Sequence, residues 1–146
     1  MAAEEARLFS LPGIPIDLAY NPASESLLVS LADAAPLNLL QLDPATGQPV
    51  AQTRGGGDQI DFDPGRQRLI ALNPSEQSLT VVNLRTNQAT TIGLTWPPTS
   101  FAVQGQLAYV AAAGSNRLEV VDLVELQLEA EYTLTSPPIA IATRGN

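Results

Sequence analysis

The sequence repeats one block three times, and each block contains four short apolar segments separated by turns. The third apolar segment shows the repeat best, and it spans Leu37–Asp43, Leu79–Arg85 and Leu118–Val124 in turn. Its leading leucines are 42 and 39 residues apart (37 to 79 to 118). A repeat of about forty residues is typical of an array of small β units that pack on their neighbours. The sequence therefore predicts an all-β array.

Each block predicts four antiparallel strands, and the blocks cover approximately residues 14–53, 58–94 and 99–134. The first segment of each block alternates apolar with small or polar residues, which is the period of a strand with two unlike faces. Tight turns follow at Asn21-Pro22 and Asp63-Pro64, because proline fixes φ and the Asx side chain bonds the local backbone. We expect the three blocks to form a single domain over residues 1–146.

Two further segments extend the pattern at the ends of the chain. Residues 7–11 have the composition of a fourth segment, and residues 139–143 follow two prolines and alternate like a first segment. We therefore expect one extra strand at each end of the array.

Charge and residue usage exclude several classes of function. Seven basic against fifteen acidic residues give a formal net charge of −8, which argues against nucleic acid or an anionic membrane as partner. The chain contains no cysteine, histidine or lysine, so it lacks the usual general base and metal ligand. The longest apolar run, Leu107–Ala113, is too short to cross a membrane, and the start of the chain has no secretory-signal pattern. We expect an acidic, soluble protein, cytoplasmic as given, or extracytoplasmic if it belongs to a longer secreted protein.

The third block carries a resemblance to a known family. Leu107–Leu123 contains Tyr-Val, then Gly-Ser-Asn, then Val-Val-Asp, and it resembles the YVTN-type β-propeller repeat. Ile60–Ile70 is similar to that family's passage from a strand through an Asp-Pro-Gly turn to the next strand. The first two blocks depart from it, with Leu28-Val-Ser-Leu31 and Ile70-Ala-Leu-Asn73 in place of the Tyr-Val-Thr-Asn tetrapeptide. NHL-like and quinoprotein-like propellers are similar alternatives within the broad WD40-like superfamily, and the absence of a Trp-Asp dipeptide disfavours the WD type itself.

The resemblance implies a partial β-propeller, because closed propellers need about four to eight blades and three cannot close a ring. The first and last blades would each expose an apolar sheet face that a lone soluble monomer rarely tolerates. Three explanations remain open. The chain is a piece of a longer propeller, or it completes its ring by association, most simply as two copies, or it is an open array with partners on its faces.

Five residues in the connecting loops are candidates for binding. Asp58 follows three glycines and could present a carboxylate to a metal or a sugar, or could simply be solvated in a wide turn. Trp96 precedes two prolines and could form a platform for a partner or a sugar ring, or could pack one blade on the next. Asp33, Asn73 and Asn116 occupy comparable loop positions, where their oxygens could bind a cation or satisfy the backbone of their own turns.

No group in the sequence is placed to activate a nucleophile, and the acidic pairs have no acid–base partner in view. We therefore expect a non-catalytic propeller module that acts as a protein-interaction scaffold, with no cofactor. Its partner would be another protein or a second copy of itself, bound through exposed blade faces. Two alternatives remain: part of a lactonase-like or quinoprotein-like enzyme with a divalent cation or cofactor at the central channel, and an extracytoplasmic module that binds carbohydrate or a surface.

Overall fold

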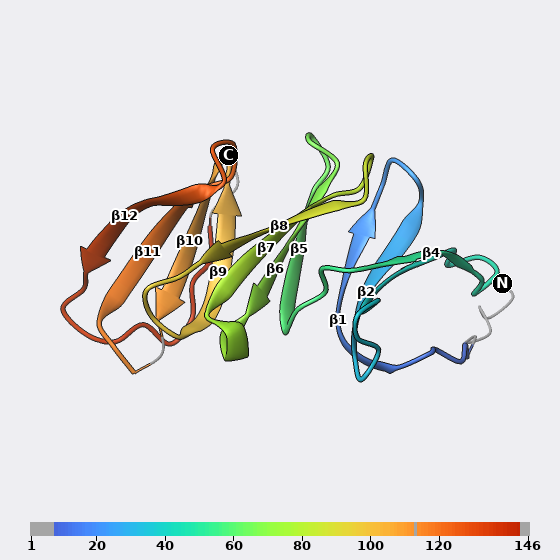
Figure 1. Cartoon of the computed structure of the whole chain (residues 1–146), viewed down its shortest axis with the longest axis horizontal. Coiled ribbons are helices and arrows are strands. Elements are labelled where there is room, and N and C mark those ends of the chain that lie inside the picture. The colour runs from blue at the N-terminus through green and yellow to red at the C-terminus, as the bar shows by residue number, and fades with distance from the viewer. Residues whose placement is uncertain (1–7, 113, 144–146) are drawn as a thin grey trace, which may run out of the picture.

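The computed structural model describes residues 8–112 and 114–143, which form twelve β-strands and one short 3-10 helix (Figure 1). The strands make three antiparallel four-stranded sheets, each from four consecutive strands, so the predicted all-β fold of three four-stranded units is confirmed. We call the sheets blades 1, 2 and 3. Blade 1 contains β1 (Ile14–Asn21), β2 (Ser26–Ala32), β3 (Leu39–Leu42) and β4 (Pro49–Thr53). Blade 2 contains β5 (Gln59–Asp63), β6 (Arg68–Asn73), the helix η1 (Pro74–Glu76), β7 (Ser78–Asn83) and β8 (Gln88–Gly93). Blade 3 contains β9 (Pro98–Gln104), β10 (Leu107–Ala112), β11 (Arg117–Asp122) and β12 (Gln127–Thr133).

The turn after the third strand of each blade is the feature that recurs most regularly along the chain. At Asp43, Asn83 and Asp122 a side-chain oxygen accepts hydrogen bonds from the backbone N–H groups two and three residues further on. These Asx residues are 40 and 39 residues apart (43 to 83 to 122), a more regular period than the leading leucines indicate. The turns close because the short Asx side chain replaces a backbone turn bond.

Strand pairing corrects the alignment of the first block. Leu42 pairs with Leu27 as Val82 pairs with Leu69, so the true counterpart of Leu79 is Leu39 and not Leu37. The predicted alignment was wrong by two residues at this point. It still put the correct residues in the core, because a shift of two leaves every side chain on the same face of a strand.

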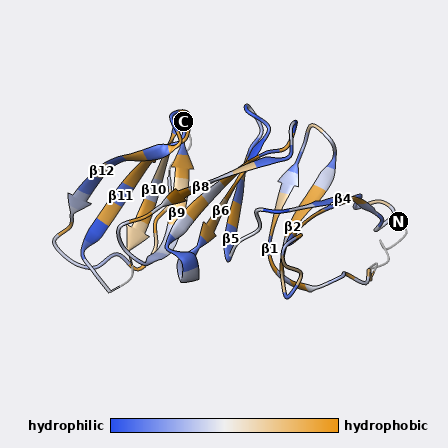
Figure 2. Ribbon diagram, viewed as in Figure 1, coloured by the Kyte–Doolittle hydropathy of each residue, from blue (hydrophilic) through white to orange (hydrophobic). Residues whose placement is uncertain are grey.

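Apolar clusters between neighbouring blades hold the array together. Between blades 2 and 3 the cluster draws on both sheets, with Ile70, Leu79 and Ile92 from blade 2 and Phe101 and Val110 from blade 3, all nearly inaccessible to solvent. A second cluster between blades 1 and 2 is smaller. Burying each such side chain stabilises the fold by about 1.5–3 kcal/mol. Figure 2 shows hydrophobic colour along much of the middle strands β2 and β6, and hydrophilic colour at the β5–β6 turn.

The two predicted flanking strands are not strands. Residues 8–11 and 139–143 have no ladder partners, and residue 7 lies outside the described part of the chain. An extended segment becomes a strand only where a neighbouring strand pairs with its backbone N–H and carbonyl groups. Neither segment has such a neighbour, because each would belong to a further blade. Each nevertheless lies against the adjacent blade. Leu11 packs on blade 1, and Thr143 Oγ1 donates a hydrogen bond to the Val103 carbonyl oxygen of β9 (2.9 Å).

Candidate functional site

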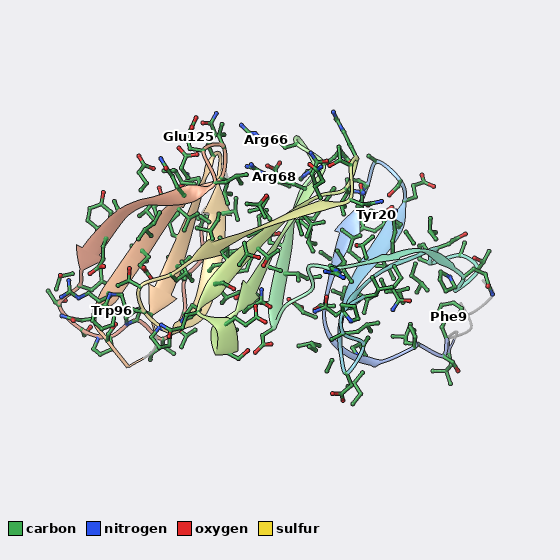
Figure 3. All side chains as sticks on the ribbon, viewed as in Figure 1. Phe9, Tyr20, Arg66, Arg68, Trp96 and Glu125 are labelled. Atoms are coloured by element: carbon green, nitrogen blue, oxygen red, sulfur yellow. The ribbon has the colours of Figure 1, made fainter. Side chains whose placement is uncertain are left out.

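Antiparallel pairing sorts the loops into two rims. The hairpin rim carries the turns within strand pairs, at residues 22–25, 43–48, 64–67, 84–87, 105–106 and 123–126. The connection rim carries the longer loops and the links between blades, at residues 33–38, 54–58, 74–77, 94–97 and 114–116. Figure 3 shows both, with Arg66, Arg68 and Glu125 at one end of the strands and Trp96 at the other. All five candidate residues belong to the connection rim or to the strand ends beside it.

The two candidate aspartates lie in exposed parts of this rim. Asp33 follows β2 with a left-handed backbone (φ 57°), and Asp58 precedes β5. The Asp58 N–H donates to the Leu72 carbonyl oxygen (2.8 Å), which fixes the backbone and leaves the carboxylate open to solvent. In the described ranges, no group of three or more acidic side chains is arranged to hold a metal ion. No helix among those residues is long and apolar enough to cross a membrane.

The two candidate asparagines bond to neighbouring strands. Asn73 Nδ2 donates to Thr80 Oγ1 (3.2 Å) within blade 2. Asn116 Nδ2 donates to the Leu134 carbonyl oxygen (2.8 Å), and the Asn116 carbonyl oxygen accepts the Leu134 N–H (2.6 Å). Both amides therefore brace loops.

Asn73 also lines a cavity of about 460 Å³ between blades 1 and 2, whose wall includes the connection-rim loops of blade 1 and the outer strand β8 of blade 2. Its polar wall includes Arg54, Glu76 and Thr91, and its size is within the range of small-molecule sites. None of the other four candidate residues lines this cavity.

Trp96 is held by a cluster that spans the link between blades 2 and 3. Glu119, which is 0% exposed, accepts the Thr95 N–H at Oε1 (2.7 Å) and the Trp96 N–H at Oε2 (3.4 Å). The Arg117 guanidinium lies 5.7 Å from the centre of the indole ring and pairs with Glu131 (3.0 Å). The indole is half-buried, and its Nε1 has no hydrogen-bond partner among the described residues. This geometry fits a residue that fastens the link to blade 3.

The first strands of the blades, β1, β5 and β9, form the inner edge of the array and carry a repeated contact between blades. We call this contact, made by Asp17 and Gln59, the latch. Asp17 Oδ2 of blade 1 accepts the Ile60 N–H of blade 2 (2.8 Å). Gln59 occupies the same position in blade 2, and its amide both accepts from the Phe101 N–H (3.2 Å) and donates to the Phe101 carbonyl oxygen (3.0 Å). Blade 3 has Ser100 at this position, and its buried hydroxyl has no partner in the described part of the chain.

Charge accumulates beside the latch. Desolvation by the neighbouring strands raises the pKa of Asp61, and the nearby carboxylates of Asp63 and Asp17 raise it further, although the Phe62 N–H opposes the shift. The carboxylate remains partly open to solvent at the inner edge of β5. No described arginine pairs with it, since Arg66 and Arg68 both bond Asp63 (3.5 and 3.0 Å). The inner edge of the array is therefore acidic.

A second inter-blade contact lies on the hairpin rim. Arg68 is only 7% exposed, and it donates through Nη1 to the Leu123 carbonyl oxygen of blade 3. Asn21 Nδ2 similarly reaches Gln67 Oε1 from blade 1 to blade 2 (3.4 Å). Each junction is thus held by its apolar cluster together with polar contacts at the inner strand and at the hairpin rim.

Blade 3 presents an apolar face that no described blade covers, which we call the open face and define by Tyr109, Leu118 and Tyr132. Val120, which pairs with Tyr109 on this face, is already buried (4% exposed). The three defining side chains lie on the side of the sheet opposite blade 2, at the positions that Ile70, Leu79 and Ile92 hold in blade 2. The three blade 2 residues are at most 5% exposed, since blade 3 covers them. Tyr132 is 55% exposed, and Tyr109 and Leu118 are half-buried.

Sequence reasoning missed Glu119, the latch residues and Arg68. One signal was available for Glu119, because it is a carboxylate between Leu118 and Val120 in an otherwise apolar strand. The turns at Asn21 and Asp63 align Asp17 with Gln59, but the sequence does not show that either side chain bonds the backbone of the next blade.

No protein-family model and no curated protein matches the sequence. Solved structures do match. They include the Kuenenia stuttgartiensis hydrazine synthase (TM-score 0.70, 18% identity, 96% of this chain and 42% of that one). The Neurospora crassa Pan2 WD40 domain matches with TM-score 0.69 and 12% identity over 90% of this chain and 41% of that one. The Myceliophteria thermophila Cps50 (Swd1) β-propeller domain matches with TM-score 0.71 and 10% identity over 88% of this chain and 46% of that one.

The chain therefore spans less than half of the length of these solved structures. The matches are to propellers of different kinds, so the YVTN assignment stays a prediction. Together with the three stacked four-stranded sheets, they show that the chain has the fold of an open, partial β-propeller.

Proposed function

We propose that this chain is a non-catalytic propeller module that serves as a protein-interaction scaffold, and that its ring is completed by further blades. Those blades come from a second copy of the chain or from the rest of a longer protein. The open face of blade 3 carries the proposal, because it repeats at Tyr109, Leu118 and Tyr132 the surface that blade 2 buries against blade 3. Leaving such side chains in water costs about 1.5–3 kcal/mol each compared with burying them.

The structural neighbours support the general part of this proposal. They include WD40 domains as well as hydrazine synthase, so the propeller fold alone is compatible with both scaffolds and enzymes. What favours a scaffold here is the composition of the rims. The described Asp58 and Asp33 carboxylates stand apart in solvent, and Trp96, Asn73 and Asn116 are engaged in internal contacts.

Hydrogen exchange as a function of protein concentration tests the self-association form of the proposal. Docking of a second copy on the open face slows exchange in β11 and β12, while β8, which blade 3 already flanks, keeps its rate. Tyr132→Asp places a charge in the face and abolishes the concentration dependence. Val124→Asp is the matched control, because Val124 is similarly exposed (48%) but lies on the hairpin rim. Equal exchange at all concentrations in the unaltered chain would contradict self-association through this face.

A further inference from the structure

The outer face of blade 1 is covered by a segment of the same chain, residues 8–13, which we call the cap. The surface under the cap is the apolar cluster of blade 1 formed by Val29, Leu31, Leu40 and Leu42, and Leu11 of the cap packs on it. All four cluster side chains are at most 5% exposed. The face expected to stand open at this end of the array is therefore closed over its middle strands.

The cap approaches blade 1 closely at two glycines, Gly13 and Gly47. A Cβ on Gly13 would lie 2.8 Å from the Ala32 carbonyl oxygen, so the segment runs tightly against the end of β2. The Phe9 ring lies against Gly47 in the β3–β4 turn, where a Cβ would come within 1.9 Å of the ring carbon Cδ1. Figure 3 shows Phe9 between the N-terminal segment and that turn. Only glycine at position 47 leaves room for the ring.

The cap is an incomplete cover. It makes no strand ladder with blade 1, and Leu18 and Tyr20 on the inner part of the same face remain 62% and 51% exposed. The residues at the Leu18 position in the other blades are Ile60 and Phe101, which are 6% and 2% exposed because a preceding blade covers them. A docked blade thus buries apolar surface here that the cap leaves in water.

We infer that the cap is displaceable, that it holds closed a blade-docking face, and that the occupant that displaces it is blade 3 of a second copy of this chain. This inference rests on the proposed function, because it makes the capped face of blade 1 the surface to which the open face of blade 3 binds. Two chains joined blade 3 to blade 1 at both ends would form a ring of about six blades, within the range of closed propellers.

The polar positions at such a junction are compatible. Between blades 1 and 2 the Asn21 amide donates to Gln67 across the hairpin rim. At the junction between copies, Gln104 in blade 3 of one copy takes the place of Asn21, and Glu25 in blade 1 of the other copy takes the place of Gln67. The Gln104 amide can donate a hydrogen bond to the Glu25 carboxylate. Glu25 and Gln67 share a left-handed backbone (φ 49° and 52°), so their side chains leave the turn from the same geometry.

Gly47→Ala tests the cap, and Gly105→Ala is its matched control. Both glycines have a left-handed backbone in a turn (φ 71° and 61°), so the new methyl group strains both, but no described atom lies within 4 Å of a Cβ at Gly105. In Gly47→Ala the Phe9 ring loses its seat, and cleavage at Phe9 by chymotrypsin should accelerate about tenfold, the change expected when one large side chain leaves its site. The dimer should also form at about tenfold lower protein concentration. Phe9→Ala removes the same contact without strain in the turn. It should likewise lower the protein concentration at which the dimer forms.

The outcomes separate the two proposals. Equal cleavage of Gly47→Ala and Gly105→Ala would overturn the cap. Faster cleavage without tighter association would overturn a second copy as the occupant. The double variant Gly47→Ala/Tyr132→Asp should be cleaved fast and stay monomeric. If Tyr132→Asp leaves the dimer intact while Gly47→Ala tightens it, the open face of blade 3 is not the partner surface, and the proposed function fails while the cap stands.

Discussion

At the residue scale, polar side chains placed between blades explain most of what the repeat does not. Glu119 is a carboxylate with no exposed surface, and its two oxygens receive the N–H groups of Thr95 and Trp96. A buried charge is tolerated only where hydrogen bonds replace its hydration. The inter-blade link with Trp96 is thus ordered by a side chain from the blade that follows it.

Replacing Glu119 by alanine should loosen this link. The two N–H groups lose their acceptor, so the free energy of unfolding should fall by about 1–3 kcal/mol. Trp96 is the only tryptophan, so the emission maximum reports on this site alone and should shift to the red. Glu129→Ala, at an exposed position in β12, is the control. An unchanged emission maximum in Glu119→Ala would show that the carboxylate does not order the indole.

The latch gives a second residue-scale prediction. Gln59→Ala leaves both the N–H and the carbonyl of Phe101 without their partner, so it should lower the free energy of unfolding by about 1–3 kcal/mol in denaturant titration. Ser100→Ala, at the equivalent position, should change it by less than about 0.5 kcal/mol, because the hydroxyl has no partner among the described residues. Similar losses from both variants would mean that the position does not act as a latch.

At the scale of elements, the hairpin turns define the units and carry a pH dependence. Hydrogen bonds from the backbone of Ala45 and from the side chain of Thr46 lower the pKa of Asp43 below its ordinary 3.8. The backbone N–H groups of Glu125 and Val124 do the same for Asp122, with help from the Arg68 charge. A lowered folded-state pKa contributes stability above the ordinary value, and that contribution is lost as the pH falls through the lowered pKa.

Asp122→Asn should therefore flatten the acid side of the stability curve. The amide oxygen still accepts the turn bonds, as Asn83 does in blade 2, so the melting temperature at neutral pH should change little. Below 3.8 the variant should lose less stability than the unaltered chain, because its turn has no proton to gain. Thermal melting followed by circular dichroism over this range measures the effect, with Glu129→Gln as a control of equal charge change. Parallel curves for Asp122→Asn and the unaltered chain would contradict the assignment.

The elements were predictable from the sequence to the extent that their signals are local. Alternation gave the strands, and Asn21-Pro22 and Asp63-Pro64 gave their turns, because both depend on neighbours in the chain. The flanking strands failed because strand formation at residues 139–143 requires a ladder partner, which is a non-local condition. The site was less predictable, since Asp17 and Gln59 bond the backbone of the next blade and Glu119 bonds the link before its own blade.

At the scale of the whole molecule, the chain is an arc whose two ends differ. Blade 1 is closed over its middle strands by residues 8–13, whereas blade 3 leaves Tyr132 and its neighbours open. The internal junctions show what each end lacks, because the counterparts of Leu18 (Ile60 and Phe101) and of Leu118 (Leu39 and Leu79) are buried where a blade has a neighbour. Only 15% of the residues are charged, and large apolar side chains at both ends, such as Leu18 and Tyr132, remain exposed.

The mass in solution, measured by light scattering across a range of protein concentrations, tests the ring-completion account most directly. The account predicts that the 15.4 kDa chain associates into a dimer as concentration rises, and that Tyr132→Asp returns it to the monomer. Discrete association to two chains is expected because two arcs of three blades close a ring and leave no face for a third. A soluble chain that keeps the monomer mass at every concentration would contradict it.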